Sequence, residues 1–271
     1  MKNMKLNLNV ICPAHRTWLP ALMLSLLGFA VFVSTAGEPA APSASEKSGY
    51  HLFNRTPDDA LREISTDRPD KTESPYTVDA GHFQIEMDVV SYTRNHDSAD
   101  GADTVMDGFA IAPVNLKVGL FNDVDLQVML DTYNHVSSRD RQAGTTDHQS
   151  GFGDVTVRLK KNFWGNDGGQ TAFAMMPFIK APTNQDGLGN RAVEGGIILS
   201  LAVELPLGWG MGLMTEFDFL RNDEDSGYHT AFVNTVTLSH DLIGHLGGYV
   251  DFSAKSVRNA TRRGLARWIW D

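Results

Sequence analysis

The sequence predicts an all-β fold, an antiparallel transmembrane β-barrel of the outer-membrane type. Three observations support this prediction. Apolar and polar residues alternate with a period of two from Gly81 onward, as they do in strands whose two faces meet different surroundings. The connections between these segments are in turn long and short, which is typical of barrels with short periplasmic turns and extended surface loops. A basic and then apolar segment begins the chain.

The first 36 residues have the features of a secretory signal peptide. Lys2, Lys5 and Arg16 provide a positive start, residues 19–33 are an apolar stretch, and residues 34–36 are small. A membrane anchor is the competing interpretation, but a helix needs about 20 apolar residues to cross a bilayer. We therefore expect export and removal of residues 1–36.

The composition of the remaining chain excludes two classes of function. The only cysteine, Cys12, lies in the expected signal peptide, so the mature chain has no thiol chemistry and no disulfide framework. Loss of residues 1–36 removes three basic residues and no acidic one, which changes the formal net charge from −10 to −13. A chain this acidic lacks the basic surface that nucleic acid requires.

Residues 37–80 are expected to form a periplasmic N-terminal tail. Residues 39–45 contain only Pro, Ala and Ser, which is too poor in large apolar groups to pack. Residues 58–64 suit one or two helical turns, because Asp58 and Asp59 favour a helix start.

Residues 81–256 are expected to form the barrel. Each predicted strand has the nine or more residues that a tilted membrane strand needs. The predicted strands are 82–93, 108–121, 123–135, 151–164, 170–181, 193–206, 208–221, 228–241 and 245–256, and the predicted surface loops are 94–107, 136–150, 182–192 and 222–227.

The phase of the strands separates a lipid face from a lumen face. In residues 193–206, for example, Leu199 and Leu201 alternate with Ser200 and Ala202. Charged residues in the polar phase of three strands are the candidates for the lumen and are expected to pair across neighbouring strands: Arg158, Lys160, Glu194, Glu204, Glu216 and Asp218. Two roles remain open, because such charges can hold the wall together or select the solute.

Residues 257–271 are expected to be a basic tail outside the barrel, poorly ordered or helical. They contain four arginines and no alternation, and a strand with adjacent Arg262 and Arg263 would turn one of them toward lipid. The predicted barrel therefore has nine strands and an opening between its first and last strands. Either the tail is a basic amphipathic helix, or the reading frame is shifted or truncated. We favour disruption, because an open sheet leaves unpaired backbone groups in hydrocarbon.

Several motifs resemble one family. They are Thr66 to Asp70 with Thr72 to Pro75, then Gly151 to Lys160, Pro177 to Thr183, Val193 to Gly196 and Ala202 to Pro206. In this order they resemble the outer-membrane transporter family named for the meta-cleavage pathway of phenol degradation. The resemblance spans about residues 66–255 and implies a channel-like barrel with aromatic compounds as cargo. Lys71 stands where the resemblance implies an apolar residue.

No constellation in the sequence indicates catalysis. The histidines are scattered, and no Gly-x-Ser-x-Gly turn is present. Ser239, His240 and Asp241 are adjacent, but adjacent strand residues point to opposite faces. The acidic loop segments lack the spacing of a calcium site. We therefore expect no enzyme activity, no catalytic residue, no cofactor and no metal.

The first functional hypothesis is an outer-membrane channel or transporter for small molecules, aromatic or hydrophobic, with no chemical step. The alternative is a structural or adhesive barrel that binds through the surface loops 94–107 and 136–150, and the third is a barrel-embedded hydrolase. The expected partners are outer-membrane lipid and lipopolysaccharide, the barrel-assembly machinery and a small-molecule solute, and nucleic acid is not expected. The expected location is the bacterial outer membrane.

Overall fold

The computed structural model describes residues 47–68, 71–98, 103–222, 226–243, 246–258 and 267–270. The expected signal peptide and residues 259–266 of the basic tail lie outside these ranges. The described chain is antiparallel and all-β, which confirms the predicted fold class. Within these residues, no helix is both long enough and apolar enough to span a bilayer.

The strands form two sheets, of ten and four strands. Their bounds are β1 (Phe83–Met87), β2 (Val90–Asp97), β3 (Thr104–Ile111), β4 (Val114–Phe121), β5 (Val124–Leu130), β6 (Tyr133–Asp140), β7 (Thr145–Gly151), β8 (Val155–Trp164), β9 (Thr171–Ala181), β10 (Glu194–Leu205), β11 (Trp209–Arg221), β12 (Tyr228–Ile243), β13 (Leu246–Arg258) and β14 (Arg267–Trp270). Two short 3-10 turns, η1 (Asp58–Ala60) and η3 (Pro206–Gly208), complete the described elements.

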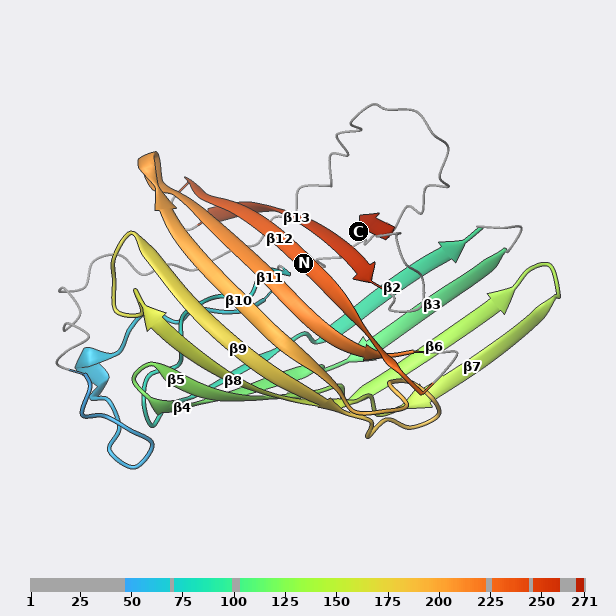
Figure 1. Cartoon of the computed structure of the whole chain (residues 1–271), viewed down its shortest axis with the longest axis horizontal. Coiled ribbons are helices and arrows are strands. Elements are labelled where there is room, and N and C mark those ends of the chain that lie inside the picture. Colours follow the sequence, from blue (N-terminus) through green and yellow to red (C-terminus); the bar gives the residue numbers. More distant parts are fainter. Residues whose placement is uncertain are drawn as a thin grey trace.

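The two sheets form one up-and-down meander. The large sheet has the order β1-β4-β5-β8-β9-β10-β11-β12-β13-β14 and the small one has the order β2-β3-β6-β7. Each strand of the small sheet is followed or preceded, after a short break, by a strand of the large one. The first four long strands are therefore each divided in two by a kink. In Figure 1, β8–β13 form a curved sheet, and the hairpins β2–β3 and β6–β7 project beyond it at one end.

The break between β3 and β4 has a local cause. Ala112 has a φ of +50°, and Pro113 after it has no N–H to donate to a neighbouring strand. The hydroxyl of Thr132 donates to the carbonyls of Ile111 at 2.5 Å and Ala112 at 2.9 Å. A side chain therefore takes part of the hydrogen bonding that regular pairing would provide at this point.

The expected loops 94–107 and 136–150 are mostly strand, which corrects the prediction. β2 and β3 pair from Val90 with Ile111 to Asp97 with Thr104, and β6 and β7 pair in the same way. Residues 94–97 and 136–150 are mostly polar, so they lack the alternation that identifies a strand. Across β2 and β3, the Tyr92 hydroxyl donates to Asp107 at 2.5 Å, and the Tyr92 and Phe109 ring centroids lie 4.7 Å apart.

The expected boundary of the barrel at residue 256 was also wrong. β13 continues to Arg258, and residues 267–270 pair with β13 as β14. The reason is the length of β12, which begins at Tyr228 and whose Thr230 pairs with Arg258. Among the described residues no pairing joins β1 to β14, so these two strands are the edges of the sheet.

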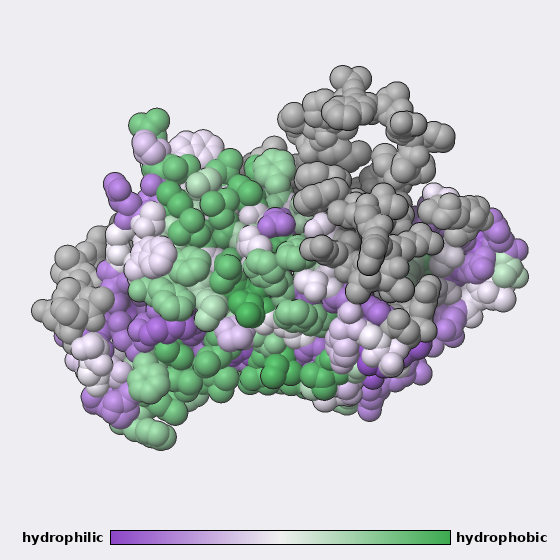
Figure 2. Space-filling model, viewed as in Figure 1, coloured by the Kyte–Doolittle hydropathy of each residue, from purple (hydrophilic) through white to green (hydrophobic). Residues whose placement is uncertain are grey.

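The two faces of the curved sheet reverse the arrangement of a water-soluble protein. On β8, Lys160 is 0% exposed and Asn162 2%, whereas Leu159 and Phe163 on the opposite face are 42% and 52% exposed. Figure 2 shows hydrophobic side chains over the middle of the curved sheet and hydrophilic side chains toward the projecting hairpins. Polar groups therefore lie on the concave inside and apolar groups on the outside.

Candidate functional site

Residues 61–68 and 71–80, which we call the lumenal segment, lie against the concave face of the sheet. Their polar groups contact side chains of β1, β4, β5, β8 and β11–β13. The expectation that residues 37–80 form a tail outside the barrel was therefore wrong for this part. The physical reason is charge: the inner face carries buried cations, and the segment supplies the acids that neutralise them.

Polar contacts hold both ends of residues 62–79 at the short-turn end of the sheet. The Arg62 guanidinium lies 3.2 Å from a carboxylate oxygen of Asp79 and 3.2 Å from one of Asp167 in the β8–β9 turn. Lys47 Nζ lies 3.3 and 2.9 Å from the same two groups. Burial alone would raise the pKa of Asp167, but a hydrogen bond from Asn122 and the charges of Arg62 and Lys47 hold this pKa below its usual range.

The segment approaches the backbone of β4 at Gly119. Gly81 N–H donates to the Gly119 carbonyl at 2.8 Å. A Cβ atom on Gly119 would lie 2.0 Å from the Asp79 carbonyl oxygen. Only glycine leaves room for the segment here, and an isolated glycine within a strand is a signal for such an approach.

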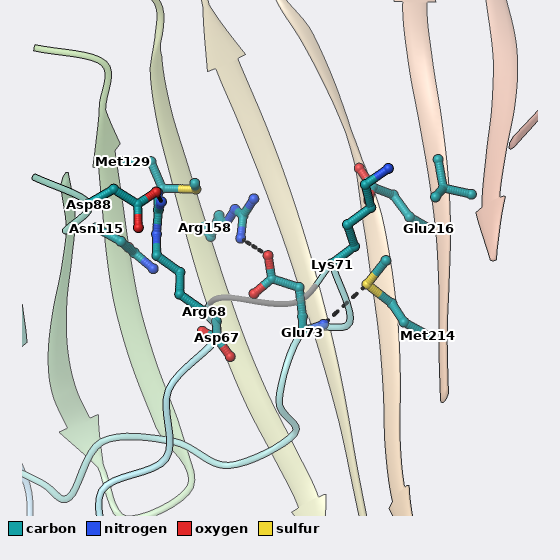
Figure 3. A pocket seen from close by; sticks show the side chains of 11 residues that line it. Asp67, Arg68, Lys71, Glu73, Asp88, Asn115, Met129, Arg158, Met214 and Glu216 are labelled. Carbon is teal, nitrogen blue, oxygen red and sulfur yellow. Dashed lines mark hydrogen bonds and ion pairs between the residues drawn. The ribbon is translucent and has the colours of Figure 1, made fainter. Parts of the chain in front are cut away.

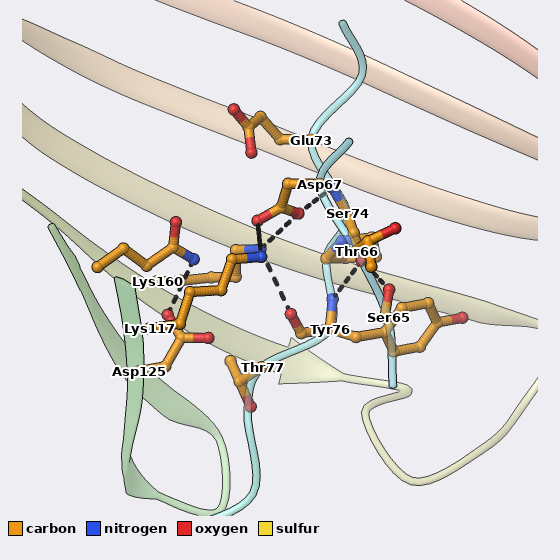
Figure 4. Close-up of polar contacts among 12 residues, drawn as sticks. Ser65, Thr66, Asp67, Glu73, Ser74, Tyr76, Thr77, Lys117, Asp125 and Lys160 are labelled. Atoms are coloured by element: carbon orange, nitrogen blue, oxygen red, sulfur yellow. Dashed lines mark hydrogen bonds and ion pairs between the residues drawn. The ribbon is translucent and has the colours of Figure 1, made fainter. Parts of the chain in front are cut away.

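Asp67 is the centre of a buried charge cluster (Figure 4). Its carboxylate accepts from Lys160 Nζ at 3.0 and 3.1 Å and forms an ion pair with Lys117. Lys117 Nζ also lies 2.6 Å from Glu86 on β1. Ser74 N–H donates to Asp67 at 2.9 Å, so the segment folds back on itself around this carboxylate.

Glu73 forms a second ion pair beside a cavity. Arg158 Nη1 donates to Glu73 Oε1 at 2.6 Å. The cavity has a volume of about 310 Å³, and its wall includes Glu73, Arg158, Arg68, Asn115 and Met214 (Figure 3). This space lies between the lumenal segment and the strands, next to both charge clusters.

Thr72 joins the segment to the last long strands. Its hydroxyl lies 2.6 Å from that of Thr235, and Thr237 donates to it at 2.7 Å. Lys71 N–H donates to Asp251 on β13 at 3.1 Å. The segment therefore spans the lumen from β4 to β13.

The six predicted lumen residues occupy the inward-facing positions of their strands, but they lie at different positions along those strands. Arg158 and Lys160 pair with Glu73 and Asp67 of the lumenal segment, which corrects the expectation that they pair across neighbouring strands. On β11, Glu216 lines the cavity and Asp218 is buried.

Glu194 and Glu204 stand at opposite ends of β10 and belong to neither charge cluster. Glu194 accepts from Arg221 N–H at 2.8 Å, whereas Glu204 is exposed at the short-turn end. Sequence reasoning missed Asp67, Thr72 and Glu73 as site residues. The signal that could have identified them is the acidic motif of residues 66–75, because the inward-facing Arg158 and Lys160 need acidic partners.

The described residues offer no cluster of three or more His, Cys, Asp or Glu side chains that could hold a metal ion. His240 Nε2 donates to the Leu207 carbonyl oxygen at 3.0 Å, and its ring packs against Trp209. It thus belongs to the turn end of the sheet rather than to the lumen cluster.

The comparisons with known proteins fit this architecture. No curated protein matches the chain. One family model matches residues 66–265, from the charged motif of the lumenal segment through all of β13 and beyond it. The match extends past residue 255, where the resemblance seen in the sequence ends, into the basic tail. Because this match covers well over half of its length, the chain belongs to the family described as "Putative MetA-pathway of phenol degradation".

Proposed function

We propose that the protein is an outer-membrane channel through which small molecules pass, with no chemical step and no cofactor. The main support is the inside-out distribution of side chains. Buried lysines and asparagines line the concave face, while Leu, Ile and Phe side chains are exposed on the convex face. Such a surface favours lipid outside and a polar, solvated interior.

The lumenal segment defines the path in this proposal. It crosses the interior between the charge clusters. Solute therefore passes either through the cavity beside the segment or through the space that opens when the segment moves. The name of the family supports a phenolic or other aromatic solute. Outer-membrane lipid, lipopolysaccharide and the barrel-assembly machinery are the further partners that we propose for a protein of this kind.

Reconstitution of the mature protein tests this proposal. In planar bilayers we expect discrete conductance steps, and in liposomes we expect uptake of small aromatic molecules at a rate above that of protein-free vesicles. Protein that is inserted, judged by heat-modifiable migration in gels, but gives neither current nor uptake would contradict the proposal.

A second candidate is an adhesive or structural barrel, favoured by the two hairpins β2–β3 and β6–β7, which project beyond the curved sheet at one end (Figure 1). Shortening both hairpins separates the two functions. A channel keeps its conductance after this change. An adhesive protein instead loses binding to cells or to lipopolysaccharide, and it gives no conductance even before the hairpins are shortened.

A further inference from the structure

We propose that the lumenal cavity binds a neutral aromatic molecule carrying two hydroxyl groups. This inference rests on the proposed function, because it treats the cavity as part of the solute path. It adds the chemical class of the solute and the atoms that recognise it. The cavity brings together the lumenal segment and strands β4, β5, β8, β11 and β12 (Figure 3).

Three buried polar atoms in the wall of the cavity call for a ligand. Glu73 Oε2, Arg158 Nε and Asn115 Oδ1 have no hydrogen-bond partner among the described residues, and all three residues line the cavity. Two of these atoms accept hydrogen bonds and one donates. Buried polar groups are normally paired, because leaving them unpaired after loss of water is costly.

The number and type of these atoms match two hydroxyl groups. One hydroxyl can donate to Glu73 Oε2 and accept from Arg158 Nε, since a hydroxyl has both a donor and acceptor lone pairs. A second hydroxyl can donate to Asn115 Oδ1. A molecule with only one hydroxyl leaves one of the two acceptors without a donor.

The charges around the cavity favour a neutral molecule. Arg158 is already paired with Glu73, and Arg68 with Asp88, both at 2.6 Å. The wall contains four acidic residues, Asp67, Glu73, Asp88 and Glu216, and three basic residues, Arg68, Lys71 and Arg158. A carboxylate ligand would have to compete with these internal acids for the cations.

The apolar part of the wall favours an aromatic ring. It consists of Met129, Met214 and Val233, and thioether sulfurs make favourable contacts with aromatic rings. Glu73 N–H lies 3.5 Å from Met214 Sδ, which orients this thioether (Figure 3). The polar atoms and the sulfur-lined wall thus face one space.

Calorimetry on the detergent-solubilised mature protein tests the inference with four ligands of similar ring size. These are 1,2-dihydroxybenzene, phenol, toluene and benzoate. We expect the dihydroxybenzene to bind about tenfold more tightly than phenol, as expected for one additional satisfied hydrogen bond, and toluene and benzoate to bind more weakly still. Equal or tighter binding of benzoate or toluene, or no binding of the dihydroxybenzene, overturns the inference.

The variant Asn115→Leu removes one acceptor at similar size. It should lower the affinity for the dihydroxybenzene to that for phenol while leaving phenol binding unchanged. Asn134→Leu, on β6 at the wall of a different cavity, is the control and should change neither affinity. If Asn115→Leu fails to fold, loss of phenol binding will reveal this, and the ranking of the four ligands on the unaltered protein decides the matter.

Conductance measured on the same preparation separates the two proposals. A protein that conducts but does not prefer the dihydroxybenzene sinks the present inference and leaves the channel standing. A protein that prefers it but passes no current or solute sinks the channel and leaves a binding site.

Discussion

Asp67 neutralises two buried lysines. It is the acidic partner of Lys160, and it shares Lys117 with Glu86. We predict that Asp67→Asn destabilises the protein by about 3–5 kcal/mol, the usual cost of removing one partner from a buried ion pair. Unfolding by urea in detergent micelles, followed by tryptophan fluorescence, measures this loss.

Asp88→Asn is the matched control, because Asp88 pairs with Arg68 where both side chains are about a third exposed. Such a pair contributes about 0–1 kcal/mol. Equal losses for the two variants would show that the Asp67 cluster is not buried in the protein.

Gly119 leaves space for the lumenal segment. In Gly119→Ala the new methyl group would lie 2.0 Å from the Asp79 carbonyl oxygen, so we predict displacement of the segment from β4 without loss of the sheet. Limited proteolysis should cleave residues 61–80 faster while heat-modifiable migration is retained. Gly108→Ala, where the nearest atom is 3.9 Å away, should behave as the unaltered protein; rapid cleavage in both would refute the explanation.

Asp167 gives the N-terminal contacts a dependence on pH. Its pKa is lowered in the folded state, so its contribution to stability is complete above the ordinary value of 3.8 and disappears as the pH falls through the lower folded pKa. We predict that residues 47–62 become accessible to pepsin only below about pH 4. Asp167→Asn removes the titrating group, so accessibility should then be higher at pH 5 and vary little with further acidification.

At the scale of elements, the contact of the lumenal segment with β12 can be made covalent. The hydroxyls of Thr72 and Thr235 lie 2.6 Å apart, and the only natural cysteine lies in the expected signal peptide. We predict that a Thr72→Cys, Thr235→Cys pair forms a disulfide and reduces conductance and solute uptake severalfold, with recovery on reduction. Each single variant should show no effect of reductant; persistent full conductance in the oxidised pair would mean that the segment does not need to move.

The regular strands β8–β13 could be predicted from the sequence because lipid on one side and polar side chains on the other impose a period of two. The kinked strands could not be predicted fully. Residues 94–97 and 136–150 in their outer halves are mostly polar and do not alternate, and the break at Ala112 depends on a positive φ that no pattern specifies. β14 was missed because its four residues, which pair with the end of β13, are too few to show an alternating pattern.

The candidate site was predicted only in part. Strand phase identified Arg158 and Lys160, because their alternation with Val157 and Leu159 is visible in the sequence. Their partners could not be found in this way. Asp67 and Glu73 belong to an irregular extended segment with no period, whose position depends on contacts across the chain that only the fold brings together.

At the scale of the whole molecule, the convex face is the surface that lipid would cover. We predict that Leu199→Arg, near the centre of β10, costs about 2–4 kcal/mol, as for a charge at the middle of a membrane, and lowers the amount of protein in outer membranes. Leu207→Arg in the η3 turn, where Leu207 is 89% exposed, should have little effect. Equal membrane levels of both variants would contradict a lipid-facing sheet.

The contacts of the lumenal segment also imply an order of events in assembly. Thr77 contacts Asn122, 45 residues away, whereas Thr72 contacts Thr237, 165 residues away. Closing the shorter loop costs less chain entropy, so we expect the end of the segment near Thr77 to dock first, onto β4 and β5. Thr72 gains its partners only when β12 arrives. The last strands are therefore laid around a segment already in place, and the segment never has to enter a finished pore.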